Sequence, residues 1–218
     1  MGTTAQKTDN RTNAAQDTRL RILQAAENVF AQDGYNGASM RAISQQAGVA
    51  SGLLHYHFDT KENLYAAIVG WRAKAINAER LVMLRALPPG AGVPEVLTAL
   101  FRPALGQDAG GAAYARIMAR MLTADTMHQE LVRHHYDATA RIFIGALQKS
   151  GGMTWEDAAW GYNLAIHVLV SGMARSGRAE RLVGDQAPAS ADDYLNRLVG
   201  FAAGGIKEFA ASGGAAET

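Results

Sequence analysis

The stretch from Ser39 to Lys61 reads SMRAISQQAGVASGLLHYHFDTK, and it holds two short segments with helical spacing on either side of a glycine. Ser39 is a good N-cap for the first helix, which we expect to end at Ala47. Gly48 supplies a positive φ that a Cβ would strain, and a second helix is expected over 51–58. Two short helices joined by a glycine turn predict a helix-turn-helix.

The two faces of these helices carry different residues. Ile43 and Ala47 of the first helix, and Leu54 and Phe58 of the second, are spaced to pack inward. The outer face of the second helix suits insertion into a major groove, because it offers small residues for close approach and side chains for bases and phosphates. Its residues are Ser51, Gly52, Leu53, His55 and Tyr56. An ordinary αα-corner of a helical protein fits the bare spacing equally well.

Around this stretch the chain shows apolar residues at steps of three and four and no alternating β-branched run, which predicts an all-α fold. We expect helices over 18–33, 61–84, 94–106, 112–123, 127–149, 155–176 and 191–210. The polar ends, 1–17 and 212–218, are expected to be a disordered arm and tail. The remainder divides into a helix-turn-helix domain over 18–64 and a helical domain over 65–211.

The composition is that of an ordinary globular protein. The 218 residues are 48% hydrophobic and 19% charged with a formal net charge of +1, so no global basic field points to nucleic acid or an anionic membrane. The absence of cysteine excludes disulfides and thiol catalysis. Residues 1–17 lack the apolar core of a signal peptide, and the apolar stretch between Asp157 and Arg175 is too short and polar to span a bilayer. We therefore expect a cytoplasmic protein without a membrane partner.

No motif supports catalysis. The sequence lacks GxSxG, GxGxxG, P-loop and HExxH patterns. The run from Asp125 to His128 supplies only half of the paired motif of di-iron bundles. We expect no catalytic residue, no metal and no cofactor. The alternative hypothesis is a helical-bundle enzyme or metal-binding protein with an incidental helix-turn-helix-like corner.

The wider pattern over residues 18–65 resembles the TetR family of transcriptional regulators. The residues that carry the resemblance are Gly34-Tyr35, Ser39, Ile43, Ala47-Gly48-Val49, Gly52, Leu54, Tyr56-His57-Phe58, Lys61-Glu62 and Leu64. It implies an N-terminal three-helix DNA-binding domain and a C-terminal domain for effector binding and dimerisation. It also implies a homodimeric repressor that a small-molecule effector releases from a pseudo-palindromic operator in double-stranded DNA.

The resemblance assigns roles to individual positions. Ser39 is expected to cap its helix and meet a phosphate, Arg41 to reach a base or phosphate, and Lys61 to bind a phosphate. Ser51, Gly52 and Leu53 are expected to enter the groove, and His55 and Tyr56 to contact backbone and bases. Position 50 is Ala where a Ser or Asn cap is frequent, so Ser51 is expected to cap instead and shift the helix start by one residue.

The charge of the DNA-binding segment argues for a dimer. Residues 18–70 carry four basic and four acidic side chains, and phosphate neutralisation supplies much of the affinity for DNA. Two domains on adjacent half-sites would combine their contacts.

Two small-residue and apolar stripes near the C-terminus are candidates for the dimer interface. Spacings of three and four connect Ala158, Gly161, Ala165, Val168 and Gly172, and a comparable stripe holds Leu195, Leu198, Ala202, Ile206 and Phe209. Paired across two chains, these helices would form a four-helix interface, as the family resemblance implies. The alternative is that both stripes face the core of their own chain.

The middle helices are expected to enclose an effector pocket, although the sequence does not identify the effector. Methionine and aromatic side chains suit adaptable apolar cavities. The candidate lining residues are Trp71, Phe101, Tyr114, Met118, Met121, Met127, Phe143, Trp160 and His167. Arg116, Arg120 and Arg141 are candidate partners for an anionic effector.

Overall fold

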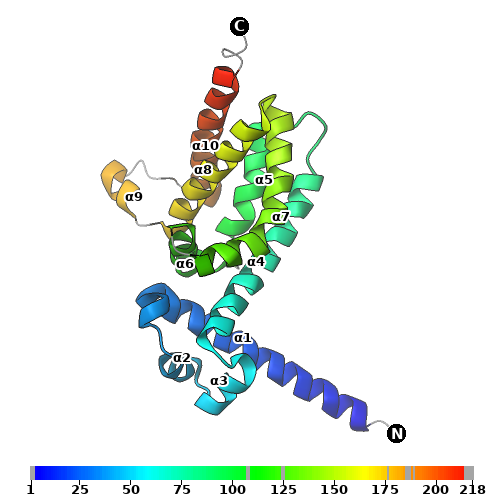
Figure 1. The fold of residues 1–218 in the computed structure, drawn as a ribbon, viewed down its shortest axis with the longest axis vertical. Helices are drawn as coiled ribbons and strands as arrows, with labels where there is room; N and C mark the ends of the chain where they lie inside the picture. Colours follow the sequence, from blue (N-terminus) through cyan, green and yellow to red (C-terminus); the bar gives the residue numbers. More distant parts are fainter. Residues whose placement is uncertain are drawn as a thin grey trace. The chain divides into compact units, whose positions relative to one another are not determined.

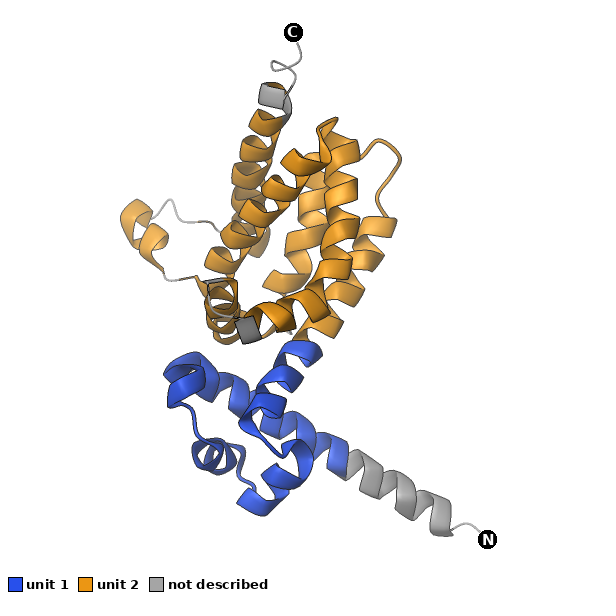
Figure 2. Cartoon of the chain, in the orientation of Figure 1, with its two compact units in different colours: residues 1–71 blue, residues 72–218 orange. Residues whose placement is uncertain are grey.

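The computed structural model describes residues 3–106, 109–123, 126–175, 177–184, 188 and 190–213. All regular elements of these described residues are helices, which confirms the all-α expectation. The chain forms two compact units, residues 1–71 and 72–218 (Figure 2). The boundary between them falls within one continuous helix, α4 (Lys61–Arg85).

The first unit consists of α1 (Thr3–Gly37), α2 (Met40–Ala47), α3 (Ser51–Phe58) and the start of α4 (Figure 1). Its core is closed by fully buried apolar side chains from all four helices, among them Phe30, Ile43, Leu54 and Leu64. Gly34 breaks the regular course of α1 with a φ of 74°, a conformation that glycine adopts without strain. The helix begins at Thr3, whereas residues 1–17 were expected to be a disordered arm.

Within the described residues, the second unit contains the rest of α4 and six further helices. These are α5 (Val93–Leu105), α6 (Gly111–Thr123), α7 (Thr126–Gly151), α8 (Trp155–Ala174), α9 (Arg178–Val183) and α10 (Ala191–Gly213) (Figure 1). Side-chain caps start two of them: the hydroxyl of Thr154 accepts from the amide of Asp157, and that of Ser190 from the amide of Asp193. Such caps satisfy amide groups that have no partner within the helix.

The short helix α9 was not expected from the sequence. None of its six residues is buried, so it carries no apolar stripe that faces a core. Periodicity finds helices through such a stripe, and α9 therefore gave no signal.

Candidate nucleic-acid interface and ligand cavity

The turn between α2 and α3 has the geometry that the sequence predicted. The hydroxyl of Ser39 caps α2 by accepting from the amide of Ala42 at 3.1 Å. Gly48 ends the helix with a φ of 64°, and the amide of Val49 donates back to the carbonyl of Ser44 at 3.0 Å. This closed glycine turn fixes the direction in which α3 leaves α2.

The bounds of α3 are those expected, but its capping differs from the expectation. The helix begins at Ser51, and Ala50 is the N-cap residue without a side-chain hydrogen bond. Ser51 is therefore the first helical residue and not the cap. Its hydroxyl lies 3.5 Å from that of Ser44, which in turn donates to the carbonyl of Arg41.

α3 has one buried face and one exposed face. Leu54 is fully buried and Phe58 is buried beside it, whereas Tyr56 is 82% exposed. The other predicted contact residues of the helix are also exposed, namely Ser51, Gly52, Leu53 and His55, as are Ser39 and Arg41 of the preceding segment. The structure therefore brings seven of the eight predicted DNA-contacting residues to exposed positions in α2, its N-cap and α3.

The space around Gly52 is empty on the side where a side chain would stand. No atom lies within 4 Å of the position that a Cβ would occupy. Packing within the chain therefore gives no reason for glycine here. An approaching surface outside the chain is a reason, because glycine lets a helix backbone come close to a partner.

His55 is held at the end of α3. Its Nδ1 lies 2.9 Å from the carbonyl oxygen of Asp59, a residue with the positive φ of 57° that closes the helix. The second ring nitrogen remains for a contact outside the chain.

Lys61 is partly exposed and is occupied within the chain. Its Nζ donates to the carbonyls of Tyr35 and Ala38 at 3.0 and 3.2 Å and lies 4.6 Å from the centre of the Tyr35 ring. An ammonium has three donors, so one is left for a phosphate. Lys61 thus also ties the start of α4 to the segment that joins α1 and α2.

A tyrosine–carboxylate pair strengthens the same junction. The Tyr35 hydroxyl donates to Oε1 of Glu62 at 2.6 Å. Burial, together with the neighbouring Glu62, raises the pKa of Tyr35 to about 12. The same hydrogen bond lowers the pKa of Glu62.

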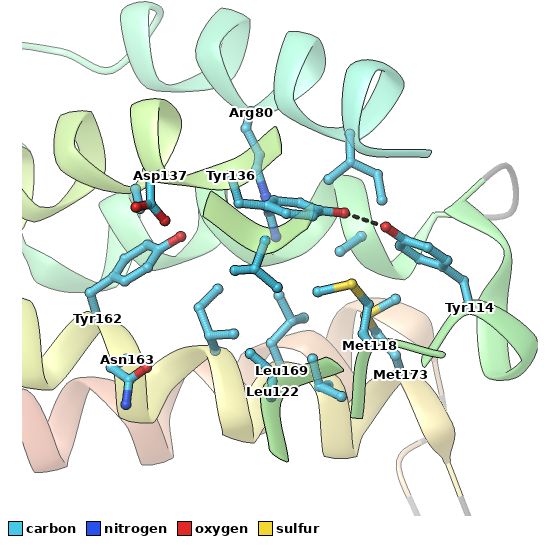
Figure 3. Close-up of a pocket in the computed structure, with 16 residues that line it drawn as sticks. Arg80, Tyr114, Met118, Leu122, Tyr136, Asp137, Tyr162, Asn163, Leu169 and Met173 are labelled. Atoms are coloured by element: carbon cyan, nitrogen blue, oxygen red, sulfur yellow. Dashed lines mark hydrogen bonds between the residues drawn. The ribbon is translucent and has the colours of Figure 1, made fainter. Parts of the chain in front are cut away.

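The second unit holds a cavity of about 140 Å³ among α4, α5, α6, α7 and α8 (Figure 3). Most of its lining is apolar, with Met118, Leu122, Leu169 and Met173 among the side chains. Arg80, Asp137, Asn163 and the three tyrosines Tyr114, Tyr136 and Tyr162 add polar groups. An apolar chamber with a few convergent polar groups is the usual form of a small-molecule site.

The polar groups of the cavity are held by the protein. Arg80 is 4% exposed, and its Nε donates to the carbonyl of Leu100 at 2.8 Å while Nη1 donates to Oδ1 of Asn77 at 3.3 Å. The hydroxyls of Tyr114 and Tyr136 are hydrogen-bonded to each other. Burial raises the pKa of Tyr136 and of Tyr162, so both phenols keep their protons at neutral pH.

The structure places only part of the predicted pocket set at this cavity. Tyr114 and Met118 line it. Phe101, Met121 and Phe143 are buried in the core but do not line it, and Trp71 belongs to the first unit. The side chain of Met127 lies outside the described residues, as does Asp125 of the half-motif.

Two predicted pocket residues face away from the cavity. Trp160 is 58% exposed, and His167 is exposed with its Nδ1 2.8 Å from the carbonyl oxygen of Asn163. The prediction for both is wrong because α8 buries a different face, which carries Tyr162, Leu169 and Met173.

Sequence reasoning missed the charged and phenolic groups of the site. The candidate arginines Arg116, Arg120 and Arg141 are all exposed, whereas the arginine that lines the cavity is Arg80. Tyr136 and Tyr162 are aromatic residues within predicted helices, as is Tyr114. The criterion that selected Tyr114 therefore also selects these two tyrosines. No signal in the sequence marks Arg80, since an arginine on a long helix is ordinarily on the surface.

The predicted interface residues of α8 and α10 pack against one another within one chain. A Cβ at Gly161 would lie 2.8 Å from Cγ1 of Ile206, and one at Gly172 would lie 2.6 Å from Cδ1 of Leu198. Ala158, Ala165, Leu195 and Ala202 are buried as well, and Val168 is partly buried. The small residues of α8 therefore let α10 of the same chain approach closely, as the alternative expected, while their place in an interface between chains stays a prediction.

An apolar face remains exposed beside this contact. Trp160, Leu164 and Phe201 are exposed large side chains, and Phe201 is 74% exposed. Leu164, Phe201 and the partly buried Phe209 line an apolar groove that runs along α8 and α10. A contiguous apolar surface of this kind is typical of a protein–protein contact.

The described residues give no support to a metal or membrane site. Among them no group of three or more histidine, aspartate or glutamate side chains is arranged to hold a metal ion. Within the same residues, no helix combines the length and apolar character needed to cross a bilayer.

Comparison with protein families gives two matches that together cover most of the chain. The family described as "Bacterial regulatory proteins, tetR family" matches residues 22–68. The family described as "Tetracyclin repressor-like, C-terminal domain" matches residues 96–205. The first match contains α2 and α3, and the second runs from within α5 to within α10.

Curated relatives are similar over the N-terminal segment. The HTH-type transcriptional regulator UidR of Escherichia coli (strain K12) is 44% identical over 61 residues, 28% of this chain and 31% of the relative. The HTH-type transcriptional repressor AcnR of Corynebacterium glutamicum is 38% identical over 52 residues, 24% of this chain and 28% of the relative. The matched segment is thus about a third of the length of these relatives.

Solved structures share the fold over most of the chain. The fatty acid degradation regulator FadR from Bacillus halodurans has a TM-score of 0.62 at 19% identity, covering 86% of this chain and 93% of that chain. A TetR transcriptional regulator from Legionella pneumophila has a TM-score of 0.59 at 19% identity, covering 84% and 93%.

Proposed function

This chain belongs to the TetR family of bacterial regulatory proteins. We therefore propose that it is a homodimeric repressor of transcription that dissociates from DNA when it binds a small molecule. The proposal places it among DNA-binding regulators and not among enzymes. The observation that carries it is the exposed face of α3, where Tyr56 stands out and the space at Gly52 is open.

The α3 helix is the element that enters the major groove in this proposal. Its length of eight residues and its exposed N-terminal residues suit the insertion of a helix N-terminus first. Ser39 and Arg41 reach the flanking phosphates or bases, and Lys61 adds one donor. Two copies of the motif bind the two halves of a pseudo-palindromic operator.

The dimer contact in this proposal is the exposed apolar face of α8 and α10. Trp160, Leu164 and Phe201 are large, apolar and uncovered in a single chain, and burying them against a second copy gains hydrophobic free energy. Such a face pairs with itself about a two-fold axis. The even balance of charge in residues 18–70 makes the second DNA-binding unit necessary for affinity.

The effector in this proposal occupies the cavity of the second unit. α4 contributes Ile76 and Arg80 to the cavity wall, and the same helix begins at Lys61, which is tied to the segment between α1 and α2. A ligand that displaces α4 changes the separation of the two α3 helices in the dimer. The affinity for the operator then falls because both helices no longer fit successive grooves. A regulator of this kind acts on chromosomal DNA, which places it in the cytoplasm.

Selection of genomic fragments tests the proposal. The purified chain is mixed with sheared DNA of its own genome, bound fragments are recovered, and their affinity is measured by fluorescence anisotropy. Tyr56→Ala is expected to weaken binding at least tenfold, while Ile142→Ala, a matched loss of an exposed apolar side chain on α7, leaves it unchanged. Failure to recover any fragment at low salt would overturn the proposal.

A further inference from the structure

The size of the cavity limits the effector to a small molecule. Its volume is about 140 Å³, and an apolar protein cavity of about 150 Å³ accommodates one benzene molecule. Ile76, Leu122, Val132 and Leu169 provide apolar wall on several sides. The body of a fitting ligand is therefore one ring or a branched chain of similar size.

Arg80 gives this small chamber a fixed positive charge. Its side chain is buried, and two of its nitrogens are held by the Leu100 carbonyl and the Asn77 amide oxygen. Neither partner is charged, and no acidic side chain of the described residues forms an ion pair with Arg80. A buried cation without a counter-ion is costly, and an anion in the cavity would remove that cost.

Asp137 is the acidic side chain of the lining, and it is partly exposed. It lies beside Tyr162, while the Tyr136–Tyr114 pair extends toward the other end of the cavity (Figure 3). Burial raises the pKa of Tyr162, and the charges of Arg80 and Asp137 act on this pKa in opposite directions, Arg80 lowering it and Asp137 raising it. Solvent screens the charge of Asp137 more than that of the buried Arg80.

The tyrosines supply donors to the same space. Burial raises the pKa of Tyr136 and Tyr162, so their hydroxyls carry protons that can be donated. The hydroxyls of Tyr114 and Tyr136 are hydrogen-bonded to each other, and Tyr162 adds a third phenol to the lining. A ligand head that accepts several hydrogen bonds and carries negative charge matches guanidinium and phenol donors, and a carboxylate has this chemistry.

We propose that the effector of this cavity is a small monocarboxylate with a single-ring or branched apolar body, whose carboxylate is bound by Arg80 and the tyrosine hydroxyls. This assignment rests on the proposed function, since it names the chemical class of the molecule that releases DNA. The apolar body lies against the aliphatic and methionine side chains of the wall.

Titration calorimetry on the full-length protein without DNA tests the chemistry with three probes of equal size. Benzoate is expected to bind at least tenfold more tightly than benzamide, which is neutral, and than benzylamine, which is a cation. Tighter binding of benzylamine than of benzoate would overturn the proposal, because the site would then belong to Asp137 and the tyrosine rings. Equal binding of all three, or binding of none at millimolar concentration, would overturn it as well.

Variants assign the effect to the charge of Arg80. Arg80→Gln is expected to remove at least nine-tenths of the preference for benzoate over benzamide, and Arg80→Lys to retain part of it. Arg141→Gln removes an exposed arginine of the neighbouring α7 and is expected to leave the preference unchanged. The comparison of probes on the wild-type protein keeps the test decisive even where Arg80→Gln fails to fold.

The outcome separates this proposal from the function on which it rests. Operator binding without any response to benzoate overturns the ligand class and leaves the regulator intact. Benzoate binding by a protein that retains no genomic fragment overturns the regulator and leaves the carboxylate site intact.

Discussion

α3 and α8 each carry a glycine inside a helix, and the space around the two glycines differs. At Gly52 of α3 no atom lies within 4 Å of the position of a Cβ, whereas at Gly161 of α8 the Cγ1 of Ile206 lies 2.8 Å from it. Gly161 makes room for another helix of its own chain, and Gly52 leaves room for something outside it. A small residue therefore indicates a close approach, and only the surroundings identify the surface that approaches.

The largest effect is expected at Gly52, which the proposed function places against DNA. Gly52→Leu adds a side chain that keeps the α3 backbone out of the groove, so the affinity for a selected operator fragment should fall at least about a hundredfold, or about 2.7 kcal/mol. The free energy of unfolding should not fall, because the added side chain meets no atom of the chain. Anisotropy and chemical denaturation measure the two quantities.

A matched variant controls this test. Gly200→Leu places the same side chain at a position of α10 that is equally open, and it should leave operator affinity unchanged. Wild-type affinity in the Gly52→Leu protein would show that α3 does not enter the groove.

The next effect concerns the apolar face that α8 and α10 leave exposed. Phe201→Glu places a charge on this face and, in a two-fold dimer, brings two such charges together. The dissociation constant of the dimer should rise at least tenfold in sedimentation equilibrium, with an unchanged circular dichroism spectrum. Val82→Glu, at an exposed position of α4, should leave the dimer intact. A dimer unaffected by Phe201→Glu would place the contact elsewhere.

A smaller effect is expected at Gly161, where Ile206 occupies the space that a side chain would need. Gly161→Ala forces a methyl group against Ile206 and should lower the free energy of unfolding by about 1–3 kcal/mol, the usual cost of overpacking. Gly204→Ala should instead raise it by about 0.5–1 kcal/mol, because alanine favours the helix and meets no neighbour. Denaturant titration gives both values, and equal shifts in the two variants would contradict the intrachain packing of α8 on α10.

The smallest effect concerns the junction at the start of α4 and its dependence on pH. Tyr35→Phe removes the hydrogen bond to Glu62, so the wild type should be slightly more stable at pH 7. The folded state raises the pKa of Tyr35 to about 12, so the unfolded chain releases the proton first and the advantage of the wild type should shrink between about pH 10 and 12. It should also shrink in acid, because the folded state lowers the pKa of Glu62. Denaturation of both proteins across this range measures the difference, and an advantage independent of pH would contradict the assignment.

The helix-turn-helix could be predicted because its local chemistry has few solutions. Gly48 requires a positive φ and Ser39 suits an N-cap, and both occur as expected. The cap of α3 could not be predicted from capping preference, since Ala50 takes the cap position without a side-chain hydrogen bond. There the packing of Leu54 and Phe58 outweighs the missing cap.

The cavity and the packing of α8 were less accessible to sequence reasoning. Apolar residues occur on more than one face of α8, so periodicity could not decide that Leu169 turns inward and Trp160 outward. The spacing of Gly161 and Gly172 is compatible with a partner in either chain. Arg80 was missed because its burial depends on acceptors from another part of the chain, the carbonyl of Leu100 above all.

The acceptor that holds Arg80 sits in a proline-containing turn of α5. Pro103 lies inside this helix and has no amide proton, so one hydrogen bond of the helix is missing in the turn that contains Leu100. The orientation of the cavity's cation is therefore set by a helix whose own backbone is interrupted nearby. In the proposed function, mutations around Pro103 offer a route by which a descendant protein changes its effector while every residue that lines the cavity stays the same.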